Sequence, residues 1–243
     1  MPYFRLSLLL KLPLLVSDAL CMRITATPPN PPLPESQGIV IPDWRENFLR
    51  GLATPSRFLR FLSWSATFLE FIVIVATLNT EGPISRLILS MLVPSDDCIS
   101  GMRITPTLLL GSILTLLGTL LRVSSYRTLG PLFTFELRIQ ERHQLVTSGP
   151  YSVVRHPSYT GLIMTVIGAF ASHASGSWVA SCGMLQTPVG KCLAIVWLSI
   201  ATAVVASLLL RVSREDGMLK ETFGAQWHEW AHDVSYSLIP GLY

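Results

Sequence analysis

Four long apolar runs dominate the pattern of the chain and are separated by polar segments. They cover residues 58–78, 104–121, 159–180 and 189–212. Each is close to the roughly 20 residues that a helix needs to cross the hydrocarbon core of a bilayer, and none carries a cluster of charges. Because helices satisfy their own backbone hydrogen bonds in lipid, the pattern predicts an all-α multipass transmembrane helix bundle with four spans.

The N-terminal stretch, residues 1–20, is a candidate for a fifth span. Lys11 and Pro13 interrupt its leucines, and Arg5 followed by a short leucine run is also typical of a signal peptide. Both interpretations stay open. The segment 27–34 then holds several prolines, which lack amide donors and favour an extended conformation over a helix, so we predict a linker there.

Composition and charge agree with a membrane location. Half of the residues are apolar and 14% are charged, against the roughly 25% that is usual for soluble domains. The net charge of +3 gives no support to a nucleic-acid partner. With the four spans in place, thirteen Lys and Arg residues fall on the side of 21–57, 122–158 and 213–243, and three on the other. The excess of positive charge places the first side in the cytosol.

These elements divide the chain into three regions. Residues 1–57 hold the candidate N-terminal span and the proline-rich linker, residues 58–122 hold two transmembrane helices, and residues 123–243 hold the region that we expect to be catalytic, because of the motifs described below. Within the last region, polar stretches at 124–158 and 213–243 flank the final pair of spans. Because two crossings separate them, they return to the same membrane face, where we predict a shared pocket on the cytosolic side.

The first polar stretch ends in a motif at the predicted start of a span, from Arg155 through Pro157 to Tyr159. Pro157 disfavours helical backbone at His156 and is well tolerated in a first helical turn. Arg155 and His156 then lie at an exposed helix start, beside backbone amides that suit a carboxylate. Interfacial anchoring by Arg155 and Tyr159 is the alternative, and the residues alone leave both open.

The second polar stretch opens with Arg211, Glu215 and Asp216. On a helix, Arg211 and Glu215 are four residues apart and share a face, whereas Asp216 points away from Arg211. An arginine at this depth can reach a substrate carboxylate, and a carboxylate one turn later can accept two sugar hydroxyls. The alternative is a plain ion pair that closes a transmembrane helix.

Other features have a structural interpretation as well as a functional one. Apolar residues after the last span recur at helical spacing and predict one amphipathic helix in the headgroup region, with Leu219, Phe223, Trp227 and Trp230 on it. The segment 132–137 is either a short extended piece or an interfacial loop. Glu70, inside the first span, indicates either function or a hydrogen bond to a neighbouring helix.

The four cysteines, Cys21, Cys98, Cys182 and Cys192, show no CxxC or metal-like spacing. We interpret them as small apolar residues in a bundle. Cys98 and Cys182 both fall in the predicted non-cytosolic loops, where they could pair if that compartment is oxidising.

At its two polar motifs the sequence resembles the isoprenylcysteine carboxyl methyltransferase family. The segment 143–161 matches the cofactor-binding signature of that family, and 211–224 matches its C-terminal signature, so the resemblance covers about residues 125–240. Upstream, 126–136 looks like fungal-type members. Family members often have a second glutamate where this chain has Asp216, which leaves open whether Glu215 or Asp216 binds the ribose of the cofactor. They commonly have tyrosines at Trp227 and Trp230.

The resemblance implies methyl esterification, from S-adenosylmethionine, of the C-terminal prenylcysteine carboxylate. Its substrates would be prenylated, CaaX-processed proteins or small prenylcysteine compounds, and its location the endoplasmic reticulum membrane, with the site open to cytosol and lipid. Arg211 would face the substrate carboxylate. The implied cofactor contacts are His143, Gln144, Leu145, Val146, Tyr151, His156, Pro157, Ser158, Tyr159 and Glu215, and no metal is expected.

Other activities compete with this interpretation. Phospholipid N-methyltransferases share the Arg-His-Pro core, and membrane sterol reductases share the general layout. The segment His228-Glu229-Trp230-Ala231-His232 fits the H-E-x-x-H pattern of zinc metalloproteases. Only one acid, Asp233, follows it, so a third zinc ligand would have to come from far upstream. A non-catalytic membrane scaffold is the last alternative, and failure to bind S-adenosylmethionine would favour it.

Overall fold

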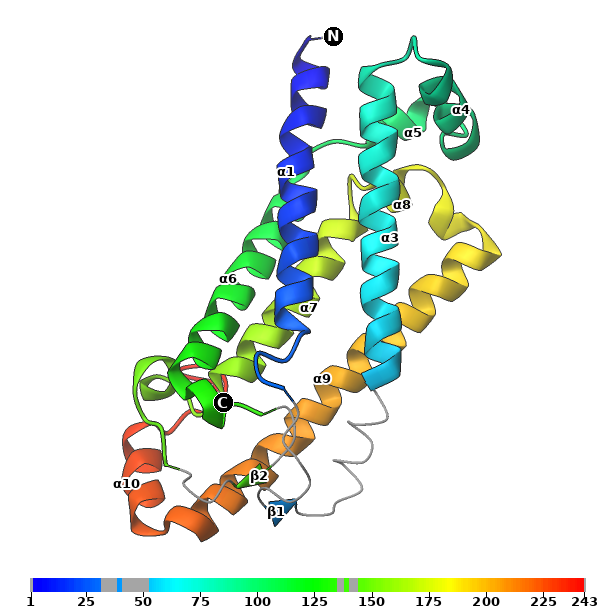
Figure 1. Ribbon diagram of the computed structural model, residues 1–243. Coiled ribbons are helices and arrows are strands. Elements are labelled where there is room, and N and C mark those ends of the chain that lie inside the picture. Colours follow the sequence, from blue (N-terminus) through cyan, green and yellow to red (C-terminus); the bar gives the residue numbers. More distant parts are fainter. Residues whose placement is uncertain (1, 32–38, 41–52, 135–137, 140–143, 243) are drawn as a thin grey trace.

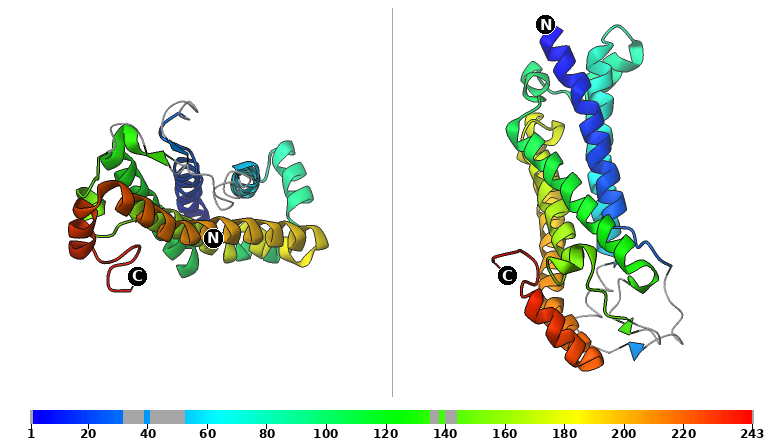
Figure 2. Two further views of the ribbon diagram at one scale, coloured as in Figure 1. Left: turned by 90° about the horizontal axis from the view of Figure 1, so that it is seen from below. Right: turned by 90° about the vertical axis from the view of Figure 1, so that its left-hand side faces the viewer.

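The structure is a computed structural model that describes residues 2–31, 39–40, 53–134, 138–139 and 144–242. Within these residues the fold is a bundle of helices, as predicted (Figure 1). Its long helices are α1 (Pro2–Thr25), α3 (Ala53–Leu78), α6 (Pro106–Leu129), α7 (Pro157–Ala174) and α9 (Pro188–Phe223). α9 runs obliquely past the others (Figures 1 and 2).

Short elements lie toward the two opposite ends of the bundle. Toward the N-terminal end of α1 are α4 (Pro83–Leu92), α5 (Asp96–Gly101) and α8 (Trp178–Ser181), the last followed by η3 (Met184–Gln186) (Figure 1). At the opposite end are η1 (Gly130–Leu132), η2 (Gly149–Ser152), α10 (Ala225–Asp233) and the antiparallel strands β1 (Ile39–Val40) and β2 (Arg138–Ile139). The polar stretches on both sides of α7 and α9 therefore do meet at one end, which we name the cytosolic end after the orientation predicted from the Lys and Arg distribution.

The segment 132–137 is only partly described. Leu132 closes η1, and Phe133 and Thr134 follow it without regular structure; the rest lies outside the described residues.

Three helical segments in the described part of the chain are long and apolar enough to cross a membrane: Arg57–Leu78, Pro106–Leu132 and Pro188–Phe223. They correspond to three of the predicted spans. The remaining one, 159–180, was predicted too long, because α7 ends at Ala174 and the chain turns at Gly176, where φ is 72°. A side chain at Gly176 would also meet the Arg103 carbonyl oxygen at 2.3 Å, so the turn needs glycine for two reasons.

α1 is a helix of the bundle, packed against α3, α6 and α7 (Figure 1). Its two buried charged residues, Lys11 and Asp18, have partners there. Lys11 pairs with Glu70 of α3 and donates to the Gly176 carbonyl oxygen, and Asp18 accepts a hydrogen bond from Ser112 of α6 at 2.7 Å. Glu70 was expected to have either a functional role or a contact with a neighbouring helix, and the structure shows such a contact, with Lys11 of α1. These contacts also explain how Lys11 and Asp18 can lie buried in an apolar bundle, since the ammonium pairs with a carboxylate and Asp18 is hydrogen-bonded.

Small residues bring α6 and α7 together along their length. A Cβ on Gly118 would lie 2.6 Å from the Gly161 carbonyl oxygen, and one on Gly168 would lie 2.6 Å from the Gly111 carbonyl oxygen. Small residues are enriched where membrane helices associate, because close approach of the backbones supplies the packing energy that water cannot. This contact fixes the start of α7 against the cytosolic end of α6.

Large apolar side chains cover much of the outer surface, as in a protein that faces lipid. Leu110, Ile195 and Phe61 are each more than 60% exposed. Apolar exposure on this scale marks a membrane or protein interface, and together with the apolar helices it makes this a membrane protein.

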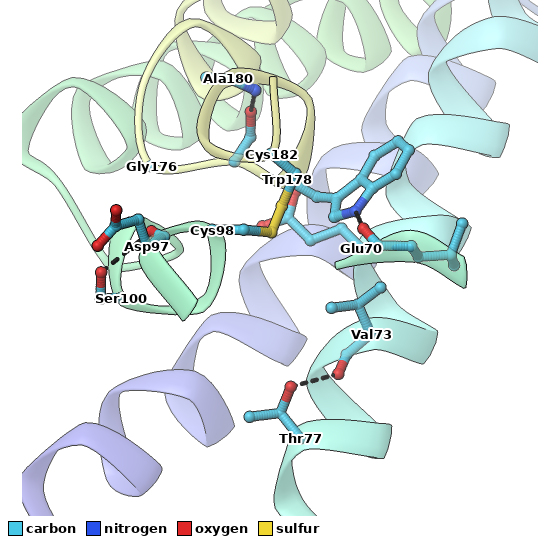
Figure 3. Close-up of a disulfide and its surroundings, with 12 residues drawn as sticks. Glu70, Val73, Thr77, Asp97, Cys98, Ser100, Gly176, Trp178, Ala180 and Cys182 are labelled. Carbon is cyan, nitrogen blue, oxygen red and sulfur yellow. Dashed lines mark hydrogen bonds between the residues drawn. A yellow bond between two sulfur atoms is a disulfide. The ribbon is translucent and has the colours of Figure 1, made fainter. Parts of the chain in front are cut away.

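A disulfide joins Cys98 of α5 to Cys182, the residue after α8 (Figure 3). Beside it, the Trp178 indole donates to the Leu92 carbonyl oxygen at 2.9 Å. The sequence left this pairing open as a possibility, and the interpretation of these two cysteines as small apolar residues in a bundle was wrong. Cys21 is buried in the bundle, as expected, whereas Cys192 is exposed.

The disulfide predicts the compartment of this end of the molecule. Because such bonds persist in oxidising compartments, an impermeant thiol reagent should label Cys98 only after sealed, cytosolic-side-out microsomes have been permeabilised and reduced. Ser213→Cys, at an exposed position near the cytosolic end of α9, is the matched control and should be labelled in intact microsomes. Labelling of Cys98 in intact, reduced microsomes would contradict this topology.

Candidate functional site

The start of α7 is held by the C-terminal tail of the chain. His156 is the residue before the helix and Pro157 is its first residue, as the motif predicted. The backbone amide of Arg155 donates to the Tyr236 carbonyl oxygen at 3.0 Å, and that of His156 donates to the Ser237 carbonyl oxygen at 2.8 Å. The tail therefore runs beside the motif and fixes its backbone.

His156 lies between α7 and α9 and is only 4% exposed. Its Nε2 lies 2.9 Å from Asp216 Oδ1, and its ring stacks on Tyr159 with the ring centres 5.4 Å apart. The expectation of an exposed helix start was wrong for this side chain, because α9 and the tail cover it. The sequence could not indicate that His156 is buried in this way, because the residues that bury it lie about 60 and 80 positions further along the chain.

Arg155 ties three segments together. Its Nε donates to Asp216 Oδ2 at 3.2 Å. Its Nη1 donates to the carbonyl oxygens of Val234 (2.9 Å) and Ser235 (2.6 Å), and its Nη2 donates to Ser237 Oγ at 2.6 Å. This planar fork satisfies acceptors on α9 and on the tail at once, a use for which arginine is suited. Arg155 thus has a structural role in holding the site together.

Glu215 is the centre of a second set of contacts. The Tyr159 hydroxyl donates to Glu215 Oε2 at 2.5 Å, and Arg211 Nε lies 3.8 Å from the same oxygen. As predicted for positions four residues apart, Arg211 and Glu215 share a face of α9, and Asp216 points elsewhere. The Glu215 side chain is 27% exposed, against 8% for Arg211, so solvent reaches the carboxylate while the guanidinium is buried beside it.

The first turn of α7 offers fewer free amides than expected. Pro157 has no amide hydrogen, and the amides of Tyr159 and Thr160 both point at the His156 carbonyl oxygen, at 3.0 and 3.3 Å. A carboxylate at this helix start would therefore depend on side chains more than on the backbone donors that the motif suggested.

The loop before the motif packs against α10. Tyr151, Trp230 and Val234 form a buried apolar cluster, and Leu145 and Val146 pack on it. The Trp230 indole donates to the Tyr151 carbonyl oxygen at 3.0 Å. Burial raises the pKa of the Tyr151 hydroxyl above its ordinary value, so it stays protonated at neutral pH.

The other predicted cofactor contacts lie in different surroundings. Gln144 is exposed to solvent. His143 lies outside the described residues. The Ser158 hydroxyl accepts a hydrogen bond from Arg122 of α6 at 3.0 Å, so it faces the interior of the bundle. Arg122 and Ser237 were missed as site residues because their partners are distant in the sequence, and no local pattern marks them.

The predicted amphipathic helix is broken into two at Gly224. There φ is 51° and ψ is −116°, which ends α9 at Phe223 and starts α10 in a new direction. The single helix was a wrong prediction, although Leu219 and Trp227 still pack on the same apolar cluster. Between α10 and the loop before η2 lies a cleft of about 480 Å³, lined by apolar Leu145 and polar Glu229 among others.

The H-E-x-x-H residues lie on the outside of α10. His228 and His232 are both exposed; His228 Nδ1 lies 2.9 Å from the Gly224 carbonyl oxygen, and His232 Nδ1 lies 3.2 Å from Asp233 Oδ1. In the part of the chain that the structure describes, no group of three or more His, Cys, Asp or Glu side chains is placed to hold a metal ion.

The fold and the site together define a membrane-embedded helix bundle with a polar site at one end, between the start of α7 and the end of α9. Residues 111–221, a little under half of the chain, match the model of the isoprenylcysteine carboxyl methyltransferase family. The matched segment includes the whole His156, Tyr159, Arg211, Glu215 and Asp216 arrangement.

Curated relatives with names of the same kind match about half of the chain. Protein-S-isoprenylcysteine O-methyltransferase B of Arabidopsis thaliana is 32% identical over 126 residues, which are 51% of this chain and 55% of the relative. Protein-S-isoprenylcysteine O-methyltransferase A of the same plant is 30% identical over 127 residues, which cover 51% and 55%. A probable protein-S-isoprenylcysteine O-methyltransferase of Oryza sativa subsp. japonica is 26% identical over 130 residues, which cover 53% and 59%. The chain thus spans little more than half the length of these plant relatives, and the likeness to fungal-type members stays a prediction.

Proposed function

We propose that this chain transfers a methyl group from S-adenosylmethionine to the C-terminal prenylcysteine carboxylate of prenylated proteins or of small prenylcysteine substrates. The observation that carries the proposal is the meeting of Tyr159, Glu215 and Arg211 at the cytosolic end of the bundle, inside the segment that matches the family. We also propose that the protein resides in the endoplasmic reticulum membrane, with this end in the cytosol.

The donor and acceptor groups at the site fit the cofactor. Asp216 is already engaged by Arg155 and His156, whereas the partly exposed Glu215 carboxylate keeps acceptor capacity for two ribose hydroxyls. The nearby apolar cluster offers Leu145 and Val146 as a surface for the flat adenine ring. We therefore assign the ribose to Glu215. When bound, the cofactor supplies a methyl group on a sulfonium, which is an electrophile.

Arg211 is the residue that we assign to the substrate carboxylate. A C-terminal carboxyl group has an ordinary pKa of about 3.3 to 3.7 and is ionised at neutral pH, so its methylation needs no general base. The protein must instead orient one carboxylate oxygen toward the methyl group, an effect that can contribute up to about 7 to 11 kcal/mol. Glu215, 3.8 Å from Arg211, orients the guanidinium and tempers its charge. A tighter clamp on the carboxylate would stabilise the ground state and slow the transfer.

The membrane location suits a lipid-modified substrate. Burial of a prenyl chain contributes about 0.8 kcal/mol for each CH₂ group, and the bundle presents long apolar helices to lipid next to the site. A substrate can thus keep its prenyl group in the membrane while its carboxylate reaches the cytosolic end.

Methyl transfer in membranes that contain the chain tests the proposal directly. Labelled S-adenosylmethionine should methylate N-acetyl-farnesylcysteine, giving an ester that base hydrolyses, with phosphatidylethanolamine present as a competing acceptor and membranes without the chain as the control. Label in phosphatidylethanolamine alone would favour a phospholipid N-methyltransferase. Label in neither acceptor would contradict the proposal.

A further inference from the structure

Arg122 joins three helices just inside the cytosolic end of the bundle. It is 5% exposed, and its Nε donates to the Thr25 carbonyl oxygen at the end of α1, at 2.8 Å. Its Nη1 donates to the carbonyl oxygen and the hydroxyl of Ser158 in the first turn of α7, at 2.8 and 3.0 Å. A single side chain of α6 therefore connects the end of α1 to the start of α7.

Neighbouring residues are fitted around this side chain. The Tyr126 hydroxyl donates to the same Thr25 carbonyl oxygen at 3.1 Å, and the Arg122 guanidinium carbon lies 5.2 Å from the centre of the Tyr126 ring. On α7, a Cβ at Gly161 would come within 3.0 Å of the Arg122 backbone nitrogen. Glycine at this position thus lets the helices approach at the level where Arg122 reaches Ser158.

Ser158 lies between the contacts that define the site. The next residue, Tyr159, donates to Glu215, and two residues earlier His156 contacts Asp216. A shift of this helical turn would move both contacts together. Arg122 bonds to the backbone carbonyl of the turn as well as to a side chain, so it constrains the position of the turn itself.

A charged group in an apolar helix is costly, and its presence points to a specific use. Here the fork of the guanidinium reaches acceptors on α1 and α7 at the same time. Lysine, with a compact ammonium on a flexible stem, keeps the charge but cannot hold both acceptors in one fixed plane.

We propose that Arg122 is a positioning residue for the site: it fixes the first turn of α7 against α1, and through that turn sets His156 and Tyr159 for the cofactor. Arg122 does not itself touch a reactant. The inference rests on the proposed function only in naming S-adenosylmethionine as the ligand. The position of the first turn of α7 can be measured in the chain without any ligand.

The test compares Arg122→Lys and Arg122→Gln with Ser112→Ala, using the full purified chain in lipid nanodiscs. Ser112→Ala is the matched control because it removes another α1–α6 hydrogen bond, the one between Ser112 and Asp18, far from the site. Hydrogen–deuterium exchange without ligand should rise at residues 157–161 in both Arg122 variants and stay at the wild-type level there in Ser112→Ala. The dissociation constant for S-adenosylmethionine should rise roughly tenfold in Arg122→Lys, as expected for a weakened set of hydrogen bonds to a charged group, while KM for N-acetyl-farnesylcysteine changes less than about threefold.

The outcomes distinguish a positioning role of Arg122 from a general structural role. Unchanged exchange at 157–161, or a rise spread evenly over the bundle, would show that Arg122 has only a general structural role and overturns the proposal. So would a local rise in exchange with unchanged cofactor affinity. If the wild-type chain binds S-adenosylmethionine but methylates no prenylcysteine, the proposed function fails, and the exchange and binding measurements still decide the role of Arg122.

Discussion

Replacing Arg211 by alanine is expected to lower methyl transfer by roughly ten- to a hundredfold, the loss that corresponds to a charge-assisted hydrogen bond of about 1.5 to 3 kcal/mol. Arg211 is buried and lies on the same face of α9 as Glu215, at the position that we assign to the substrate carboxylate. The measurement is kcat/KM for N-acetyl-farnesylcysteine at saturating S-adenosylmethionine.

Two further variants separate the methyltransferase from a zinc protease. Arg211→Lys keeps the charge but loses the planar fork, so its activity should fall between those of the wild type and Arg211→Ala. His228→Ala is the matched control, because His228 is exposed on α10 and its described contacts, with the Gly224 carbonyl oxygen and, edge to face, the Trp227 ring, are local to α10. Its methyl transfer should stay within a few-fold of the wild type. An inactive His228→Ala beside an active Arg211→Ala would overturn the assignment.

The sequence predicted the fold well wherever hydrophobicity alone decides it. α3, α6 and α9 are long and apolar and were located from their composition. α1 could not be assigned in this way, because its compatibility with an apolar bundle depends on Lys11 meeting Glu70 and Asp18 meeting Ser112 on other helices. A hydropathy pattern shows that these charged residues are unfavourable in an apolar helix, but it cannot predict which residues of other helices contact them.

For the site, the sequence predicted contacts within one helix and missed contacts between helices. The shared face of Arg211 and Glu215 follows from a spacing of four residues and is present in the structure. Two other contacts form only because α7, α9 and the C-terminal tail meet in the fold. These are the contact of His156 with Asp216 and the hydrogen bond from Arg155 to the Ser235 carbonyl oxygen in the tail. Gly224 was likewise read as part of one helix, because hydrophobic spacing continues across it while the backbone does not.

The neighbouring acids Glu215 and Asp216 should have different roles, although the sequence left open which one binds the ribose. The Asp216 side chain is 15% exposed and is held by Arg155 and His156. Glu215 is more exposed, at 27%; the Tyr159 hydroxyl donates to it, whereas Arg211 Nε and His156 Nδ1 lie beyond hydrogen-bond distance, at 3.8 and 3.9 Å. Asp216 therefore builds the site, and Glu215 keeps capacity to bind a ligand.

Glu215→Gln and Asp216→Asn test this division, because each change removes a charge and keeps the shape of the side chain. Glu215→Gln should raise the dissociation constant for S-adenosylmethionine by roughly ten- to a hundredfold, since the ribose hydroxyls lose a charged acceptor worth about 1.5 to 3 kcal/mol, and should leave thermal unfolding nearly unchanged. Asp216→Asn should instead lower the Tm, because the Arg155 and His156 contacts lose their charged partner and the cost of the partly buried Arg155 is no longer compensated. Calorimetric titration with S-adenosylmethionine and thermal unfolding in the same detergent provide both readouts for both variants. If Asp216→Asn weakens binding at an unchanged Tm while Glu215→Gln lowers the Tm, the two roles are exchanged and the ribose belongs to Asp216.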